Sequence, residues 1–418
     1  MAYLNVQSEI GPLKRVLVHK PGQETQRYPH GDFLQAFHLR PTYSGFDLEK
    51  AQREHDDLVR VLRDHEVEVV ELTDLVTEVI ASSQEAKDSL VDTYLKDCRI
   101  EGEEFSGAAR QYFEEASTSE QLTQRLFEGI RYGDTWLANP EQFPLATSAG
   151  WAFDPDTYLT GPLNTSFFVR DPMNVIGGGV TLNHMYWHDR NREVDLFEAI
   201  TEHHPAFQGS PRWFDHNCSF HMEGGDLINI DEHTLAVGLS ERTEAAAIDV
   251  LCQRLIPADC GTPVRSVYVF EVPQIGNRLH LDTYLARIDH DTFIVDPALA
   301  HASSVYRVTQ SPSGTGLKVE ALASSLPHIL EEMAGISGIR LIQLDENPSS
   351  RIETEYANGA MGMLCLSPGN LCVCEENVLV NDVLDRAGMT LHPVSIQEMT
   401  VGFGGPASLC LPLHREGI

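Results

Sequence analysis

The sequence predicts an α/β fold built from repeated units of strand, strand, helix and strand, with a helical insertion in its first part. Two observations carry this prediction. Two stretches in the second half of the chain show the same order of elements, and residues 73–136 show helical spacing with almost no strand pattern. Repeated units must bury their apolar faces against neighbours, which favours a ring or a solenoid. A plain doubly wound sheet is the alternative, because periodicity alone does not separate the two.

The first part of the chain predicts a strand, a helix and a second strand. Residues 13–19 (LKRVLVH) alternate in hydrophobicity and stop before Pro21-Gly22, as a strand that enters a loop does. Apolar residues return at helical spacing over 48–63, and 67–72 (VEVVEL) has strand chemistry again.

The predicted insertion, residues 73–149, is rich in Glu, Gln, Ala, Leu and Ser. We expect helices over 83–96 and 119–130 within it. The predicted organisation is therefore one main domain, formed by residues 1–72 and 150–418, which is interrupted by a helical insertion domain.

Two repeated units are predicted beyond residue 220. The elements of the first are two strands, a helix and a strand at 227–230, 234–239, 243–255 and 267–272. Those of the second follow the same order at 363–366, 371–374, 378–387 and 390–394. Each strand pair flanks a short polar turn, as in a hairpin.

Composition excludes several classes of function. The 418 residues include 30 Lys and Arg against 62 Asp and Glu, a formal charge of −32 that disfavours binding to nucleic acid or to an anionic membrane. No apolar run approaches the ~20 residues of a membrane span, and no signal-peptide pattern opens the sequence. Eight scattered cysteines indicate reduced thiols in a cytoplasmic protein. The acidic surface leaves assembly into a homo-oligomer open.

Four polar runs interrupt the apolar pattern where the predicted strands end, which is the usual place for functional residues. They are 164–179, 221–226, 279–283 and 404–412. In the third run, His280 and Asp282 alternate around Leu281, so an extended strand would present both on one face, where they could carry a proton beside a charge. A satisfied pair in a half-buried sheet is the structural alternative, and so short a pattern favours it.

The run 221–226 (HMEGGD) places Glu223 before two glycines, which indicates a close approach of backbones. Its carboxylates could simply cap that turn. In 164–179, Arg170 and Asp171 could form a salt bridge with each other, but adjacent side chains on a strand point in opposite directions.

A metal site finds little support in the spacing of candidate ligands. Five of them crowd a nine-residue window, namely Asp215, His216, Cys218, His221 and Glu223, but they match no helical histidine pair and no Cys-x-x-Cys motif. A surface loop is favoured over zinc. The run 177–179 (GGG) lacks the spacing of a dinucleotide-binding loop.

Taken together and in this order, the polar runs resemble the arginine deiminase family of guanidino-group-modifying enzymes. The matching segments are LVHKPG (17–22), FFVRDP (167–172), GGGVTLNHMYW with RNRE (177–193), HMEGGD (221–226), LAVGLSERT (235–243), LHLDT (279–283) and GGPASLCLPL (404–413). The resemblance implies a five-bladed α/β propeller of strand-strand-helix-strand modules, with pseudo-fivefold symmetry and an inserted helical domain.

The resemblance also implies a reaction. A cysteine thiolate attacks the guanidinium carbon of L-arginine, ammonia leaves, and water hydrolyses the amidino-enzyme to citrulline. Asp171 and Asp282 would accept hydrogen bonds from the guanidinium, for which paired carboxylates are suited. His280 would protonate the departing ammonia and then activate water, and Glu223 would orient His280.

The implied substrate is a small guanidino molecule, L-arginine or an analogue, and neither a metal nor an organic cofactor is implied. Asn164, Arg190 and Arg242 would hold its α-carboxylate. Asn164 lies one residue farther from Asp171 than the family pattern has it.

The nucleophile position departs from the family. Its cysteine lies four residues before the second proline of the last motif, and that position is Ser408 here. Cys410 lies two places on, which along a strand is about 6–7 Å away. Three explanations are open: an introduced Cys→Ser change that traps a substrate complex, a lineage that has lost deimination, or serine chemistry or rescue by Cys410.

Other departures concern substrate recognition. Ala407 replaces a basic residue, 401–403 lacks arginines, and 33–46 is long for a substrate lid, so a modified guanidine remains open as substrate. The predicted function is an arginine deiminase-like hydrolase that forms citrulline and ammonia and is impaired by Ser408. The alternatives are an amidinotransferase, in which an amine replaces water, and a non-catalytic guanidine-binding protein.

Overall fold

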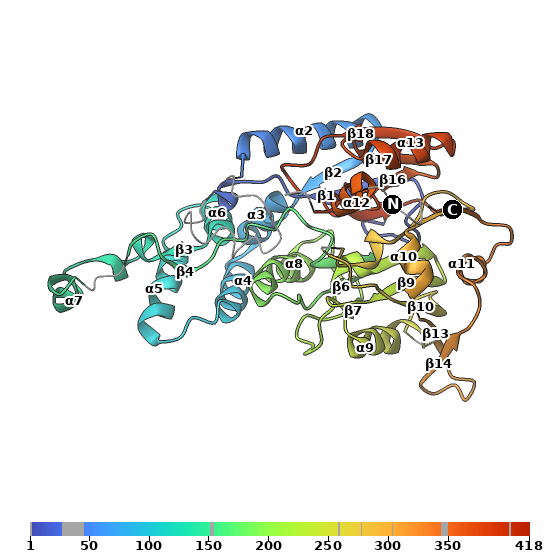
Figure 1. Cartoon of the computed structure of the whole chain (residues 1–418). Coiled ribbons are helices and arrows are strands. Elements are labelled where there is room, and N and C mark those ends of the chain that lie inside the picture. Colours follow the sequence, from blue (N-terminus) through green and yellow to red (C-terminus); the bar gives the residue numbers. More distant parts are fainter. Residues whose placement is uncertain are drawn as a thin grey trace.

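The computed structural model describes residues 2–26, 46–150, 154–257, 260–276, 278–302, 304–343, 350–400 and 403–418. In these ranges the chain has a mixed α/β fold with several small sheets (Figure 1). Five of the sheets contain the same unit, an antiparallel strand pair whose second strand also pairs in parallel with a third. A helix precedes each third strand. The described ranges do not form the single doubly wound sheet that was the alternative.

The two ends of the chain complete the first unit together. In it, β1 (Leu13–Val18) lies between β19 (Leu411–Arg415), antiparallel, and β2 (Glu68–Glu71), parallel. The connecting helix is α2 (Leu48–Asp64), whose first turn is capped by the Asp47 side chain. The termini lie side by side in Figure 1, and the amide of Arg415 donates to the carbonyl of Asn5 at 2.7 Å.

The remaining units follow one another along the chain. The second consists of β5 (Met173–Ile176), β6 (Gly179–Leu182), α8 (Asn191–His203) and β7 (Arg212–Phe214). The third consists of β8 (Leu227–Asp231), β9 (Thr234–Leu239), α9 (Ala245–Leu255) and β10 (Ser266–Glu271). The hairpin β13 (Val305–Gln310) and β14 (Leu317–Leu322) extends this third sheet.

The fourth unit has β11 (Leu285–Arg287), β12 (Thr292–Val295) and β15 (Arg340–Gln343), with α10 (Pro297–Ala302) and α11 (Leu326–Ala334) before its third strand. After α12 (Ser350–Ala357), the fifth has β16 (Leu364–Ser367), β17 (Asn370–Cys374), α13 (Val378–Arg386) and β18 (Thr390–Val394). The two repeated units predicted from the sequence are confirmed as the third and the fifth.

Between the first and second units the chain is mainly helical, as predicted. It forms α3 (Leu72–Ser82), α4 (Gln84–Asp97), α5 (Glu103–Glu114), α6 (Ser119–Glu128) and α7 (Pro144–Ser148). A two-residue strand that the sequence pattern missed, β3 (Ile130–Arg131), pairs with β4 (Tyr158–Thr160). Hydroxyl groups of Ser83 and Thr118 cap α4 and α6.

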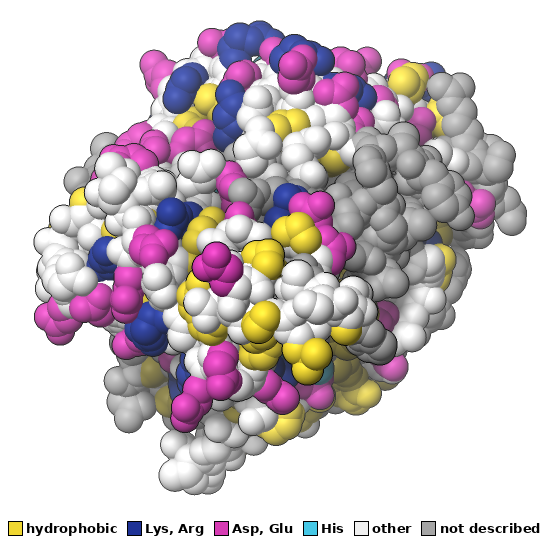
Figure 2. All heavy atoms as spheres, turned by 90° about the vertical axis from the view of Figure 1, so that its left-hand side faces the viewer, with side chains coloured by type: hydrophobic (Ala, Val, Ile, Leu, Met, Phe, Trp, Pro, Cys, Tyr) yellow, Lys and Arg dark blue, Asp and Glu magenta, His cyan; other side chains and the backbone are white. Residues whose placement is uncertain are grey.

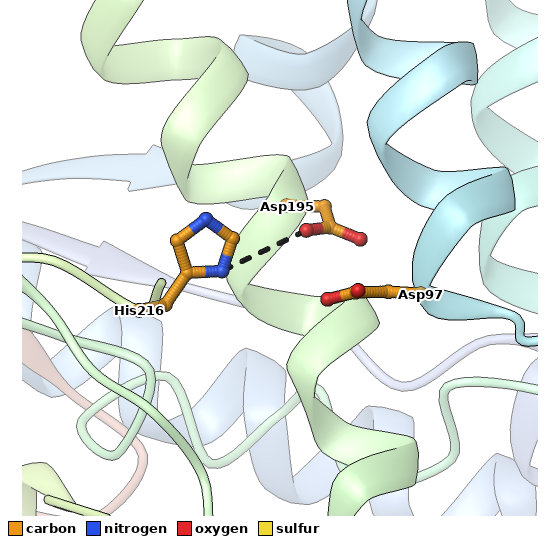
Figure 3. A group of neighbouring side chains, drawn as sticks. All are labelled: Asp97, Asp195 and His216. Carbon is orange, nitrogen blue, oxygen red and sulfur yellow. Dashed lines mark ion pairs between the residues drawn. The ribbon is translucent and has the colours of Figure 1, made fainter. Parts of the chain in front are cut away.

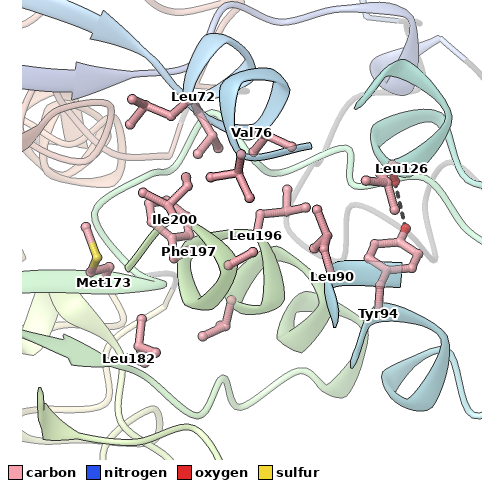
Figure 4. Close-up of a cluster of buried hydrophobic side chains, with 14 of the residues drawn as sticks. Leu72, Val76, Leu90, Tyr94, Leu126, Met173, Leu182, Leu196, Phe197 and Ile200 are labelled. Atoms are coloured by element: carbon pink, nitrogen blue, oxygen red, sulfur yellow. Dashed lines mark hydrogen bonds between the residues drawn. The ribbon is translucent and has the colours of Figure 1, made fainter. Parts of the chain in front are cut away.

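One hydrophobic cluster joins these helices to the second unit (Figure 4). Leu72 and Val76 of α3 and Leu90 of α4 face Leu196 and Phe197 of α8. The Tyr94 hydroxyl donates to the Leu126 carbonyl at 2.7 Å, which ties α4 to α6 in the same cluster. Burial of each large apolar side chain contributes about 1.5–3 kcal/mol, so α8 is held firmly from the side of the helices.

The surface is acidic, as the composition requires. On the face that the helical stretch presents, Asp and Glu side chains are spread widely and are interspersed with Lys and Arg (Figure 2).

None of the helices in the described ranges is long and apolar enough to cross a membrane. All eight cysteines are unpaired.

Candidate active site

Close contact between backbone segments brings the polar runs together. A Cβ atom on Gly224 would lie 1.9 Å from the Arg170 carbonyl oxygen, and one on Gly225 would lie 2.6 Å from Nδ1 of His280. The Gly224 amide donates to the Asp171 carbonyl at 3.1 Å. The close approach expected of these two glycines is therefore present, and any other residue there would push the segments apart.

His280 and Glu223 form an ion pair at the centre of this contact. The His280 Nε2 lies 2.9 Å from Oε2 of Glu223, which is 1 % exposed as a side chain. The other carboxylate oxygen accepts from the Tyr186 amide at 3.0 Å and lies 3.8 Å from Nη1 of Arg242. Because the Glu223 carboxylate is held on both sides, the His280 ring has a fixed orientation.

The two partners shift each other's pKa. Burial alone would raise the pKa of Glu223, but the hydrogen bond and the charge of His280, followed by Arg242 and Arg190, lower it. Burial alone would lower the pKa of His280, whereas Glu223 and the nearby Asp171 raise it. At neutral pH the pair is therefore a carboxylate and an imidazolium, and His280 carries a proton that it can donate.

His280 and Asp282 do not lie on a strand, so that part of the sequence prediction is wrong. His280 has extended backbone (φ −128°, ψ 164°) and immediately precedes the 3₁₀ helix η6 (Leu281–Thr283). The reason is a contact distant in sequence, because Asp226 accepts from the Leu281 amide at 2.8 Å and thereby holds the first turn of η6.

Asp282 and Asp171 lie beside the imidazolium. Burial, then the neighbouring charge of Asp171 opposed by that of His280, raises the pKa of Asp282 to about 7. One oxygen of Asp171, one of Glu223 and one nitrogen of His280 all lie within 4.8 Å of one another. Two carboxylates beside one imidazolium leave this cluster with a net negative charge, which favours a further cation.

Asp171 and Arg170 do not pair with each other, as expected, but the expectation assumed a strand and the two residues lie in a turn. They lie in a turn before β5, where Arg170 Nη2 contacts Oε1 of Glu9 at 2.7 Å and Asp171 Oδ2 contacts Nη1 of Arg190 at 3.0 Å. Each charge thus has a partner from elsewhere in the chain.

The residues predicted to hold an α-carboxylate differ in whether their nitrogen atoms already have partners. All three guanidinium nitrogens of Arg190 contact carboxylates, Nη1 that of Asp171 and Nε and Nη2 that of Glu193. Arg242 lies over the rings of Tyr186 and Trp187, with its central carbon 4.7 and 5.6 Å from their centroids. Among the described residues, the buried Nε of Arg242 and the buried Nδ2 of Asn164 have no hydrogen-bond acceptor.

Sequence reasoning missed two buried carboxylates. Asp226 accepts from the hydroxyls of Ser240 and Thr243, both at 2.6 Å, in addition to the Leu281 amide, and burial raises its pKa to about 6. Glu193 holds Arg190 from the first turn of α8 and accepts from Thr165. The only signal in the sequence was the presence of these acids in the motifs GGD and RNRE.

Ser408 lies in a turn, not on a strand, because β19 begins only at Leu411. It is half-buried, and its carbonyl accepts from the Arg170 amide at 3.4 Å, next to Asp171. Gly405 and Gly362 approach so closely that a Cβ on Gly405 would lie 2.3 Å from the Gly362 carbonyl oxygen, which fixes the preceding loop.

Cys410 cannot be placed beside Ser408 by strand alternation, since the chain turns between them. It is fully buried in a hydrophobic cluster, and burial raises the pKa of its thiol to about 12. A thiol of this kind is protonated at neutral pH and is a poor nucleophile. The long segment 33–46, apart from Phe46, and residues 401–402 lie outside the described residues.

The possible metal ligands between residues 215 and 223 do not lie together in the structure. Glu223 belongs to the pair with His280, whereas His216 is 7 % exposed and lies near acids of α8. The prediction of a surface loop is therefore wrong for His216 and holds for neighbours such as Asn217.

Comparison with known proteins decides the family. The family model described as arginine deiminase matches residues 44–415. The chain belongs to the arginine deiminase family. Its relatives include the arginine deiminase of Treponema denticola, 32 % identical over the whole of both chains, and that of Staphylococcus aureus, 32 % identical over 99 % of each. The family consists of amidine-hydrolysing enzymes of the arginine deiminase type.

Solved structures share the fold at lower identity. An amidinotransferase of saxitoxin biosynthesis from Microseira wollei matches with a TM-score of 0.53 and 14 % identity, over 100 % of this chain and 98 % of that one. A cysteine-to-serine mutant of the N-terminal domain of ArgZ, a cyanobacterial arginine dihydrolase, bound to its substrate, matches with a TM-score of 0.53 and 13 % identity, over 96 % of this chain and 98 % of that one.

The buried pair makes a prediction about stability and protonation. Glu223→Gln removes the counter-charge of His280, so the pKa of His280 falls, which NMR of labelled histidine measures. Removal of one partner from a buried pair costs up to about 3–5 kcal/mol. A raised histidine pKa stabilises the fold fully below pH about 6.5 and less as pH rises, and the lowered glutamate pKa stabilises it above pH about 4.5. The loss is therefore largest between pH 5 and 6.5.

Glu331→Gln is the matched control, because it removes a carboxylate 3.7 Å from the exposed His328. It should leave the pKa of His280 and the stability unchanged. An unaltered His280 pKa in Glu223→Gln would contradict the pairing.

Proposed function

We propose that this protein binds L-arginine, or a close guanidino analogue, and that the site is built to hydrolyse it with water to citrulline and ammonia through a covalent amidino-enzyme. The observation that carries the proposal is the His280–Glu223 ion pair, which lies against Asp171 and Asp282 and beside Arg242, whose buried Nε lacks an acceptor among the described residues. Membership of the arginine deiminase family supports it.

The guanidinium would lie between Asp171 and Asp282. A planar cation with paired N–H groups matches carboxylates well. The raised pKa of Asp282 shows that its ionised form is destabilised in the free protein. A bound cation would stabilise that form and release the proton, so the site is poised to take up one positive charge.

The other end of the substrate would be held by Arg242 and Asn164. Buried donors are normally paired, and an unpaired one costs about 1–3 kcal/mol. An α-carboxylate would satisfy Nε of Arg242 and Nδ2 of Asn164 together. Arg190 remains a predicted third contact, which would require it to give up part of its pairing with Asp171.

His280 would supply the proton and the base. In the first step, a thiolate at position 408 forms a bond to the guanidinium carbon, and the C–N bond breaks as His280 protonates the leaving ammonia. In the second, neutral His280 takes one proton from water, whose oxygen attacks the amidino carbon and expels the thiolate. The remaining O–H proton passes to solvent, where it converts the released ammonia to ammonium. Glu223 would keep the ring oriented throughout, and Asp226 would position the backbone of η6 that bears His280 and Asp282.

Ser408 would leave this machinery without its nucleophile. A serine hydroxyl is far less reactive than a thiolate at neutral pH, and the imidazolium form of His280 cannot act as its base. The buried, protonated Cys410 offers no substitute. The proposal is therefore that the present chain binds substrate and turns it over slowly or not at all.

The proposal extends to architecture and location. We infer that the five units form the blades of an α/β propeller with pseudo-fivefold symmetry, which residues 1–72 and 150–418 build as the catalytic domain. Residues 73–149 would be an inserted helical domain. The unpaired cysteines support a cytoplasmic location.

Restoring the thiol tests the function. Ser408→Cys should form citrulline from L-arginine at least about 10³-fold faster than the unchanged chain, because the nucleophile is then a thiolate. Colorimetric citrulline assay with ammonia release measures it. Cys410→Ser added to that variant is the control and should retain the activity.

The same assay separates the alternatives. Product that forms only when ornithine or glycine is supplied would show an amidinotransferase. Arginine binding by calorimetry without turnover in Ser408→Cys would show a binding protein. If Ser408→Cys forms citrulline from no guanidine offered, the hydrolase proposal is lost.

The pKa of Asp282 makes a prediction about affinity. Only ionised Asp282 attracts a cation, so the affinity for L-arginine should rise about tenfold per pH unit below pH 7 and level off above it. Isothermal titration calorimetry of the unchanged chain between pH 5.5 and 8 measures this, with proton release at the acidic end. Asp282→Asn should bind more weakly and show no such rise. A flat pH profile in the unchanged chain would contradict the role of Asp282.

A further inference from the structure

A second cluster of charged side chains lies away from the candidate active site, between α4 and α8 (Figure 3). It comprises Asp97 at the last residue of α4, Asp195 on α8, and His216 just after β7. One ligand atom from each lies within 4.8 Å of the others. In Figure 3 the two carboxylates and the imidazole face a common space, although the residues come from separate parts of the chain.

Asp195 has no partner that explains its burial. Its side chain is 0 % exposed, and neither carboxylate oxygen has a hydrogen-bond partner in the described part of the chain. The nearest positive group is Nδ1 of His216, 3.8 Å from Oδ1, which is too long for a hydrogen bond. An isolated buried carboxylate costs several kcal/mol, so something must neutralise it.

The 3.8 Å separation suits two ligands of one metal ion. Atoms that each lie about 2.1 Å from a tetrahedral centre are about 3.4 Å apart. A contraction of a few tenths of an ångström would therefore bring Asp195 and His216 to ligand geometry. Asp97 is half-buried, which leaves room for water as a further ligand.

The far side of His216 is arranged like the outer shell of a metal site. Its Nε2 lies 3.2 Å from Oε2 of Glu198, outside good hydrogen-bond geometry but within ion-pair distance. Arg212 holds the other oxygen of Glu198 at 3.2 Å. A carboxylate on one ring nitrogen favours the proton there, and the lone pair of Nδ1 is then directed at the two aspartates.

We propose that Asp97, Asp195 and His216 bind one divalent transition-metal ion of the Zn²⁺ type. Two carboxylate oxygens and one imidazole nitrogen form a mixed ligand set that suits Zn²⁺ better than Mg²⁺ or Ca²⁺, which require six or more oxygens. Asp195 and Asp97 contribute two negative charges that such an ion would balance. The ion would be structural, because it would join the end of α4 to α8, the helix that carries Glu193 in its first turn.

Zinc titration of the chelator-stripped, full-length chain tests the proposal. One Zn²⁺ should bind tightly and raise the Tm. Asp195→Asn and His216→Gln should each weaken binding at least about 100-fold, beyond the 10–100-fold typical of outer-shell changes, and abolish the rise in Tm. Asp92→Asn is the matched control, since it makes the same change at an exposed position of α4, with its side chain 62 % exposed. It should bind Zn²⁺ as the unchanged chain does.

Two further variants make each outcome decisive. Asp171, Glu223 and His280 form a second group with similar spacing, so Glu223→Gln must retain the tight zinc site. Asp97→Asn replaces the half-buried ligand and serves if the buried variants do not fold. The proposal is overturned if the unchanged chain binds no stoichiometric Zn²⁺, if Asp195→Asn or Asp97→Asn still binds it tightly, or if Glu223→Gln loses it. If the unchanged chain binds no stoichiometric Zn²⁺, a proton or the imidazolium of His216 alone neutralises Asp195.

Discussion

The buried ion pair of His280 and Glu223 is the interaction on which the rest of the site depends. A carboxylate that is 1 % exposed is stable as an anion only if its partners remain in place, so the pair draws together segments from the second, third and fourth units. Two glycines allow that approach, and Asp226 fixes the backbone of η6 from the other side. Stability and chemistry therefore share the same contacts. A change that loosens the packing of these segments would also disturb the proton donor.

The local part of the fold was readable from the sequence. Hydrophobic periodicity predicted the third and fifth units and the helices α2, α4 and α6 to within a few residues, because that periodicity is set by burial within each element. It did not predict α8. It failed where contacts distant in sequence decide the conformation. The segment at His280 looked like a strand until Asp226 was seen to hold it as a 3₁₀ helix. The same limit explains why Ser408 was placed on a strand, although it lies in a turn.

The site residues could be predicted only where they belong to a recognisable sequence motif. The resemblance to a family named the acids, the histidine and the arginines, and the structure brings Asp171, Glu223 and His280 within 4.8 Å of one another. The resemblance did not reveal that Arg190 is paired with Glu193, or that Asp97 and Asp195 converge on His216. The convergence of these acids cannot be read from spacing, since about a hundred residues separate Asp97 from Asp195.

The proposed function separates substrate binding from bond cleavage. In the proposed function the carboxylates, the unpaired donors and the imidazolium would serve binding and proton transfer, and position 408 carries a serine and no sulfur. The most direct measurement is the experimental structure of the unchanged chain with L-arginine. We expect the guanidinium between Asp171 and Asp282, and the α-carboxylate on Arg242 and Asn164. Arginine bound elsewhere, or a site into which millimolar arginine does not enter, would contradict the account.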